Sequence, residues 1–187
     1  MMQGKNLLLL LLCFTACVSF AQHKALPFAG SVFAGATEGQ QGGSLQIGAT
    51  IGVKTKTWAT SIGTGLDYYG VRSIPLYLNV EKKIFNRAQT PFVYLNGGYH
   101  FPWLKNVNNS WWNTTKANGG VYYGAGIGYQ VPASKQIALF FAAGYSFKEF
   151  REEITQRYEC LVAPCPEYSE KINYGFRRLS LTTGLRF

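Results

Sequence analysis

Eight segments of this sequence alternate between apolar residues and polar or glycine residues, each about as long as a membrane-crossing strand. They are roughly 26–36, 45–53, 58–69, 74–85, 91–101, 120–131, 136–148 and 174–187. A period of two is that of a β-strand, and a tilted strand crosses the hydrocarbon core in about 9–11 residues. Phe and Tyr, which favour strands, are abundant, and charged residues make up 14% of the chain. These features predict an all-β protein.

The face on which glycine occurs predicts how the strands are oriented. One face of 74–85 is apolar, whereas the other is polar: Ser73, Tyr77, Asn79, Glu81 and Lys83. Glycines share the polar faces elsewhere: Gly48, Gly52, Gly63, Gly65, Gly98, Gly144 and Gly184. A soluble ligand-binding barrel would bury its large apolar side chains, but glycine suits the narrow interior of a small barrel. We therefore expect the apolar face to meet lipid, with a two-sheet sandwich as the alternative.

The connections between the segments are asymmetric. Short turns are expected at 54–57, 86–90 and 132–135, and long loops at 102–119 and 149–173. Short periplasmic turns and long outer loops are typical of outer-membrane barrels. Aromatic residues are expected at the two interfaces: Trp58, Phe85, Tyr129 and Phe187 near the turns, and Tyr68, Tyr99, Phe101, Tyr145, Phe147 and Phe176 near the loops. The prediction is an eight-stranded antiparallel up-and-down transmembrane β-barrel with periplasmic termini.

The N-terminal segment has the features of a secretory signal. Lys5 precedes an apolar run, and small residues end at Ala21. We expect residues 1–21 to be a signal peptide and residues 22–187 to form the barrel domain. A lipoprotein signal acylated at Cys17 is the alternative. In an oxidising envelope, Cys160 and Cys165 are expected to form a local disulfide, the alternative being half of a zinc site.

The last strand carries a recognisable pattern. LSLTTGLRF places Leu181, Thr183 and Leu185 on one face and ends on Phe187. This segment, together with SIPLYLNVEKKIF, resembles the small outer-membrane β-barrel (porin-like) family, which is related in architecture to OmpA and OmpX. The resemblance covers residues 22–187 mostly as a pattern. It implies an outer-membrane location among lipid and lipopolysaccharide, and insertion by the barrel-assembly machinery, which would recognise these four residues. It implies little about activity.

The expected lumen contains a set of polar and charged side chains. They are Glu81, Lys83, Arg178, Arg186, Asn79 and Asn96. An unpaired charge in a narrow barrel is costly, so these side chains are expected to pair with one another and plug the lumen. The alternative is a narrow porin-like channel for ions or small solutes, whose selectivity the charges would tune.

An enzymatic role is a weaker alternative. His100, Asp67 and Ser146 are expected to face inward near the outer rim, where His could act as a general base. No family motif surrounds them, however, and their strands need not be neighbours. We therefore predict a protein that is not an enzyme, with no cofactor and no metal site.

The two long outer loops are the expected interaction surfaces. Trp103, Trp111 and Trp112 could stack on a glycan or anchor an extracellular protein, or could fold back onto the rim. The second loop holds six of the nine acidic residues, and it could bridge to lipopolysaccharide through divalent cations or be simply solvated. The formal charge of +9 does not indicate a nucleic-acid partner, because the chain is exported and lacks a basic cluster. The predicted role is structural or surface interaction.

Overall fold

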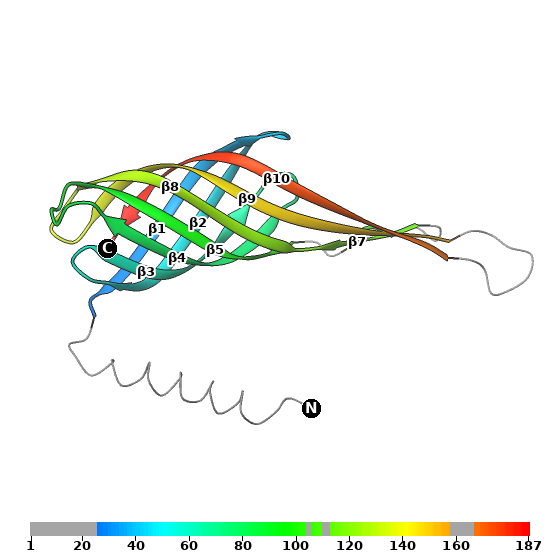
Figure 1. Ribbon diagram of the computed structural model, residues 1–187, viewed down its shortest axis with the longest axis horizontal. Coiled ribbons are helices and arrows are strands. Elements are labelled where there is room, and N and C mark those ends of the chain that lie inside the picture. Colours follow the sequence, from blue (N-terminus) through cyan, green and yellow to red (C-terminus); the bar gives the residue numbers. More distant parts are fainter. Residues whose placement is uncertain (1–25, 104–105, 110–112, 158–166) are drawn as a thin grey trace, which may run out of the picture.

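The computed structural model describes residues 26–103, 106–109, 113–157 and 167–187, which form a closed antiparallel barrel with an extension at one end (Figure 1). The barrel strands are β1 (Phe28–Gly39), β2 (Gly42–Lys54), β3 (Trp58–Asp67), β4 (Ser73–Lys83), β5 (Thr90–Pro102), β8 (Gly120–Pro132), β9 (Ala138–Arg157) and β10 (Glu167–Arg186). Each strand pairs with the next, and β10 pairs with β1 from Ser31↔Arg186 to Gly39↔Arg178. The predicted eight-stranded up-and-down barrel is confirmed. The predicted signal peptide lies outside the described residues.

No helix that is long and apolar enough to span a membrane occurs in the described part of the chain.

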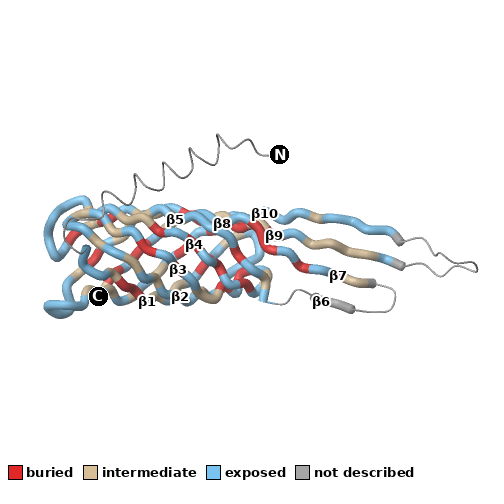
Figure 2. The backbone as a smooth tube through the Cα atoms, turned by 90° about the horizontal axis from the view of Figure 1, so that it is seen from below, coloured by how far each residue is buried: buried red, intermediate tan, exposed pale blue. Residues whose placement is uncertain are grey.

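The exterior of the barrel is apolar and its interior is mixed, as the alternation predicts. Ile62, Leu95 and Ile127 are between 57% and 67% exposed, whereas Tyr77 and Asn79 are buried. Buried residues recur at every second position along the strands (Figure 2). Leu181, Thr183, Leu185 and Phe187 all point outward on β10 or just after it. This arrangement excludes the sandwich and the barrel with an apolar interior.

Aromatic side chains gather at both ends of the apolar exterior, with one exception to the prediction. Trp58 and Phe85 are exposed near the turns, and Tyr99 and Phe101 near the opposite end. Phe176, however, is only 6% exposed and points inward. It shares the inward face of β10 with Arg178, and it packs with Tyr69, Ala117 and Phe150 in a small apolar cluster. The prediction for Phe176 was wrong because it considered only how far along the strand the residue lies. It did not consider whether the side chain faces lipid or the lumen.

Much of the two segments expected to be long loops is regular β-structure. β9 and β10 continue beyond the barrel wall as a hairpin, paired from Phe150↔Tyr174 to Arg157↔Glu167. β6 (Asn106–Asn109) and β7 (Asn113–Asn118) add to it, and β7 pairs with β9. We call the part of these four strands beyond Lys148 and Phe176 the extension, which projects from the end opposite the C-terminus (Figure 1). In this part of β9, charged residues lie on both faces, Arg151 and Glu153 on one and Glu152 on the other, so hydropathy does not alternate there.

The interior glycines allow the strands to approach closely, and β5 offers a matched test. A Cβ atom on Gly98 would lie 2.6 Å from the Cα of Tyr77, whereas one on neighbouring Gly97 would meet nothing within 4 Å. We expect Gly98→Ala to lower the free energy of unfolding by about 1–3 kcal/mol, the usual cost of overpacking. Gly97→Ala should leave it nearly unchanged. Urea unfolding of both variants in lipid vesicles tests this, and equal effects would contradict the assigned faces.

Candidate functional site: the barrel lumen

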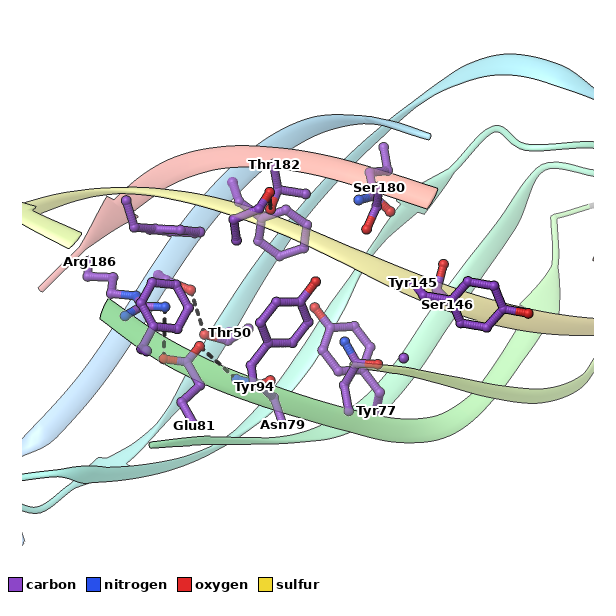
Figure 3. Close-up of a pocket in the computed structure, with 18 of the residues that line it drawn as sticks. Thr50, Tyr77, Asn79, Glu81, Tyr94, Tyr145, Ser146, Ser180, Thr182 and Arg186 are labelled. Carbon is purple, nitrogen blue, oxygen red and sulfur yellow. Dashed lines mark hydrogen bonds and ion pairs between the residues drawn. The ribbon is translucent and has the colours of Figure 1, made fainter. Parts of the chain in front are cut away.

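The lumen is crossed near the C-terminus by a charged pair from opposite walls. Arg186 on β10 and Glu81 on β4 are 2.8 Å apart, and both side chains are mostly buried (Figure 3). Asn79 donates a hydrogen bond of 3.0 Å to Glu81, and Arg186 donates one of 3.1 Å to Gln130. We call Arg186 and Glu81 the inner pair, and Asn79 and Gln130 its partners. The pair bridges the barrel because β4 and β10 lie four strands apart in the sheet order.

An aromatic layer lies against the inner pair. The Arg186 guanidinium stands 3.9 Å from the ring centre of Phe92 and 4.5 Å from that of Phe140. These two rings pack edge to face, and Phe33 and Tyr94 contact the same cluster. Gly126 and Gly144 leave room for the Tyr94 hydroxyl, since a Cβ atom at either position would collide with it. The rings exclude water from the ion pair and strengthen its attraction.

A second charged group crosses the lumen nearer the extension. Arg178 lies 2.6 Å and Lys148 3.5 Å from the same oxygen of Asp67, and none of the three side chains is more than 3% exposed. Lys148 also donates to the carbonyl oxygens of Tyr69 and Val71, each at 2.9 Å. We call Asp67, Lys148 and Arg178 the outer cluster. It joins β3, β9 and β10, so two buried cations share one carboxylate.

Further groups position the outer cluster. Ser146 accepts a hydrogen bond of 3.0 Å from Nε of Arg178, and the backbone nitrogen of Tyr69 donates one of 3.0 Å to Asp67. The Arg178 guanidinium also stands 5.4 Å and 5.8 Å from the ring centres of Tyr69 and Tyr122. One hydrogen bond, the ion pair with Asp67 and two aromatic rings hold the guanidinium in one place.

The enclosed space between the two charged groups is small. A cavity of about 70 Å³ lies among Tyr94, Asn96, Tyr122 and Ser146. That volume suits a few water molecules rather than a solute. The side chains that line this cavity come from opposite walls, and several point toward one another (Figure 3).

The predicted lumen residues divide between these groups. Glu81, Arg186 and Asn79 meet in the inner pair, while Arg178 belongs to the outer cluster. Asn96 only lines the central cavity, and Lys83 lies half-buried at the mouth nearest the termini. Sequence reasoning did not include Asp67 and Lys148 in the network. Both fall on inward-facing positions, but no pattern in the sequence shows that β3 and β9 present them to the same point.

The three residues considered for catalysis each have other partners. His100, Asp67 and Ser146 are all buried. Nε2 of His100 bonds to the backbone oxygen of Glu149, Ser146 accepts from Arg178, and Asp67 is held by two cations. No hydrogen bond joins His100 to Ser146 or to Asp67 among the described residues. In the same part of the chain, no three His, Cys, Asp or Glu side chains gather closely enough to hold a metal ion.

Exposed polar groups also lie on the extension, outside the lumen. Arg151 and Glu149 pair at 3.0 Å, and this hydrogen bond lowers the pKa of the Glu149 carboxyl. Lys171 pairs with Glu153 across the hairpin at 3.7 Å. Trp103 is 57% exposed, and its backbone nitrogen donates to the carbonyl oxygen of Arg72. The other predicted loop residues, Trp111, Trp112, Cys160 and Cys165, lie outside the described residues.

Comparison with known proteins relates this chain to others by fold alone. No protein-family model matches the sequence, and no curated protein matches it significantly. The outer membrane protein OprG from Pseudomonas aeruginosa is similar in structure, with a TM-score of 0.57, 12% identity, and coverage of 88% of this chain and 97% of that one. The N-terminal β-barrel domain of Pseudomonas aeruginosa OprF gives a TM-score of 0.48 at 13% identity, covering 85% and 97% of the two chains. The chain thus has the fold of a small outer-membrane β-barrel.

Proposed function

We propose that this protein is an outer-membrane barrel with a closed lumen that displays its extension as an interaction surface outside the cell. The observation that carries the proposal is that two charged groups cross the lumen at different levels. The inner pair and the outer cluster each join strands from different parts of the wall, with an aromatic layer beside the inner pair. We further propose that the lumen has no catalytic site, since His100, Asp67 and Ser146 each have other partners.

The closed lumen follows from the cost of opening it. A solute would have to separate Arg186 from Glu81 and then separate Arg178 and Lys148 from Asp67. Breaking a buried ion pair is strongly unfavourable, because it leaves charges without partners in a medium of low dielectric constant. A channel would need one of these groups to be exposed and mobile, whereas the outer cluster is almost fully buried.

The membrane location is supported by the exterior of the barrel. Large apolar side chains cover it, and aromatic residues mark both ends of the apolar zone, where amphipathic rings suit the headgroup level. Lipid and lipopolysaccharide would therefore surround the wall. The outward face of Leu181, Thr183, Leu185 and Phe187 leaves the last strand available to the barrel-assembly machinery during insertion.

The extension is proposed as the binding surface because it is regular and exposed. Paired strands hold its side chains in fixed relative positions, which lowers the entropy lost on binding. Its mixed charges and Trp103 nearby suit an extracellular protein or glycan. We expect the termini to lie on the periplasmic side, at the end that carries the three short turns.

Surface labelling tests this orientation. We expect Ser169→Cys, in the exposed part of the extension, to react with a membrane-impermeant maleimide on intact cells. Ser134→Cys, in the turn between β8 and β9, should react only after the outer membrane is permeabilised. Both changes are made with Cys160 and Cys165 replaced by serine. The reverse pattern would overturn the orientation, and labelling of both sites on intact cells would overturn the membrane location.

A further inference from the structure

A second cavity, next to the central one, lies at the end of the barrel that carries Phe187 and the short turns. It holds about 180 Å³, and its lining includes Glu81 and Arg186, whose inner pair closes the way to the rest of the lumen. Trp58 and the turn after β8 contribute to its wall. We call this space the cup. It lies at the opposite end from the extension, so nothing in the proposed interaction surface accounts for it.

The cup has more positive than negative side chains. Lys54, Lys83, Lys135 and Arg186 line it, whereas Glu81 is the one acidic side chain in its lining. Arg186 and Asn79 already occupy the carboxylate of Glu81. Within the described residues, no ion pair is formed by any of the three lysines. A recess lined by more cationic than anionic side chains concentrates the field and attracts anions.

Lys83 is the best placed of the three lysines. It lies at the end of β4, two residues from Glu81 on the same inward face, and it is partly buried. An ammonium group removed from part of its water is stabilised by an anion that accepts its hydrogen bonds. Lys54, the last residue of β2, and Lys135, in the turn after β8, line the same space. Three donors from three elements surround a space large enough for one oxyanion and its water.

We propose that the cup binds a small oxyanion, a phosphate or carboxylate group, with Lys83 as its principal ligand and Lys54 and Lys135 as supporting ligands. The anion is either free in solution or the headgroup of an anionic lipid at the membrane surface. This inference does not depend on the extension or on the closed lumen being correct. It requires only the barrel and its open end.

The experiment follows backbone and Trp58 indole NMR signals of the refolded protein in an uncharged detergent, while inorganic phosphate is added at a constant ionic strength of about 0.15 M. We expect saturable shifts at Gly30, Ser31 and Trp58, which line the cup. Lys83→Met should weaken the affinity by about tenfold or more, because it removes a hydrogen bond between two charged groups. Lys56→Met, in the same end of the barrel but outside the lining, is the matched control and should bind like the parent.

A second arm identifies the source of the anion. The protein is placed in nanodiscs of neutral lipid, and phosphatidylglycerol is then added in place of free phosphate. Shifts with phosphate indicate a free anion, and shifts with phosphatidylglycerol alone indicate a lipid headgroup; both support the site. If neither probe causes saturable shifts, the proposal is wrong. It is also wrong if Lys83→Met and Lys56→Met bind equally. Should Lys83→Met fail to fold, Lys54→Met takes its place, with a smaller loss expected.

Discussion

Asp67→Asn is expected to lower the free energy of unfolding by about 3–5 kcal/mol, the range found when one partner is removed from a buried ion pair. The change leaves Arg178 and Lys148 buried side by side without a carboxylate. Their mutual repulsion adds to the cost of keeping each away from water. Urea unfolding of the refolded protein in lipid vesicles measures the difference. Glu149→Gln is the control, since its partner Arg151 is exposed to solvent and the loss should be small.

A double variant shows whether charge is the cause. Adding Lys148→Met to Asp67→Asn removes one of the two uncompensated cations, and it should recover part of the lost stability. If the double variant is instead less stable by the sum of the single effects, Asp67 and Lys148 do not interact. That result would contradict the outer cluster.

Phe140→Ala is expected to produce the second large effect, a loss of about 3–5 kcal/mol. The ring is 6% exposed and packs edge to face against Phe92, beneath the guanidinium of Arg186. Its removal enlarges the central cavity and takes away part of the layer that keeps water from the inner pair. Urea unfolding in lipid vesicles is again the measurement.

The neighbouring ring provides the matched control. Phe141 is next in sequence but is 53% exposed on the outside of the barrel. Phe141→Ala leaves a gap that lipid chains can fill, so its cost should be clearly smaller. If Phe141→Ala proves equal to or more costly than Phe140→Ala, the assignment of the two faces of β9 is wrong.

The barrel could be predicted because its determinants are local. Alternation along 74–85 or 120–131 is visible within one strand, and it indicates which side chains face lipid without knowledge of any partner strand. The order of eight antiparallel strands then follows from the short connections. The extension could not be predicted in this way. Its hairpin is held by backbone pairing of residues 149–157 with residues 167–175, and charged residues on both faces of β9 conceal the period of two in that strand.

The lumen contacts were only partly predictable for a similar reason. Alternation along a single strand shows that Glu81 and Arg186 face inward, and both were expected inside the barrel. Which inward residues share a level depends on the stagger of strands that are far apart in the sequence, and a single sequence does not reveal it. Asp67 was therefore considered with His100 and Ser146 as a catalytic candidate, whereas in the structure it pairs with Lys148 and Arg178.

Conductance across a planar bilayer tests the closed lumen most directly. The refolded protein is inserted, and insertion is verified in the same membrane by cleavage of the exposed extension with a protease added on one side. We expect no discrete conductance steps from the parent protein, because the inner pair and the outer cluster both cross the lumen. Reproducible steps from the inserted parent, with an ion selectivity altered by Glu81→Gln, would contradict the closed lumen and establish a channel.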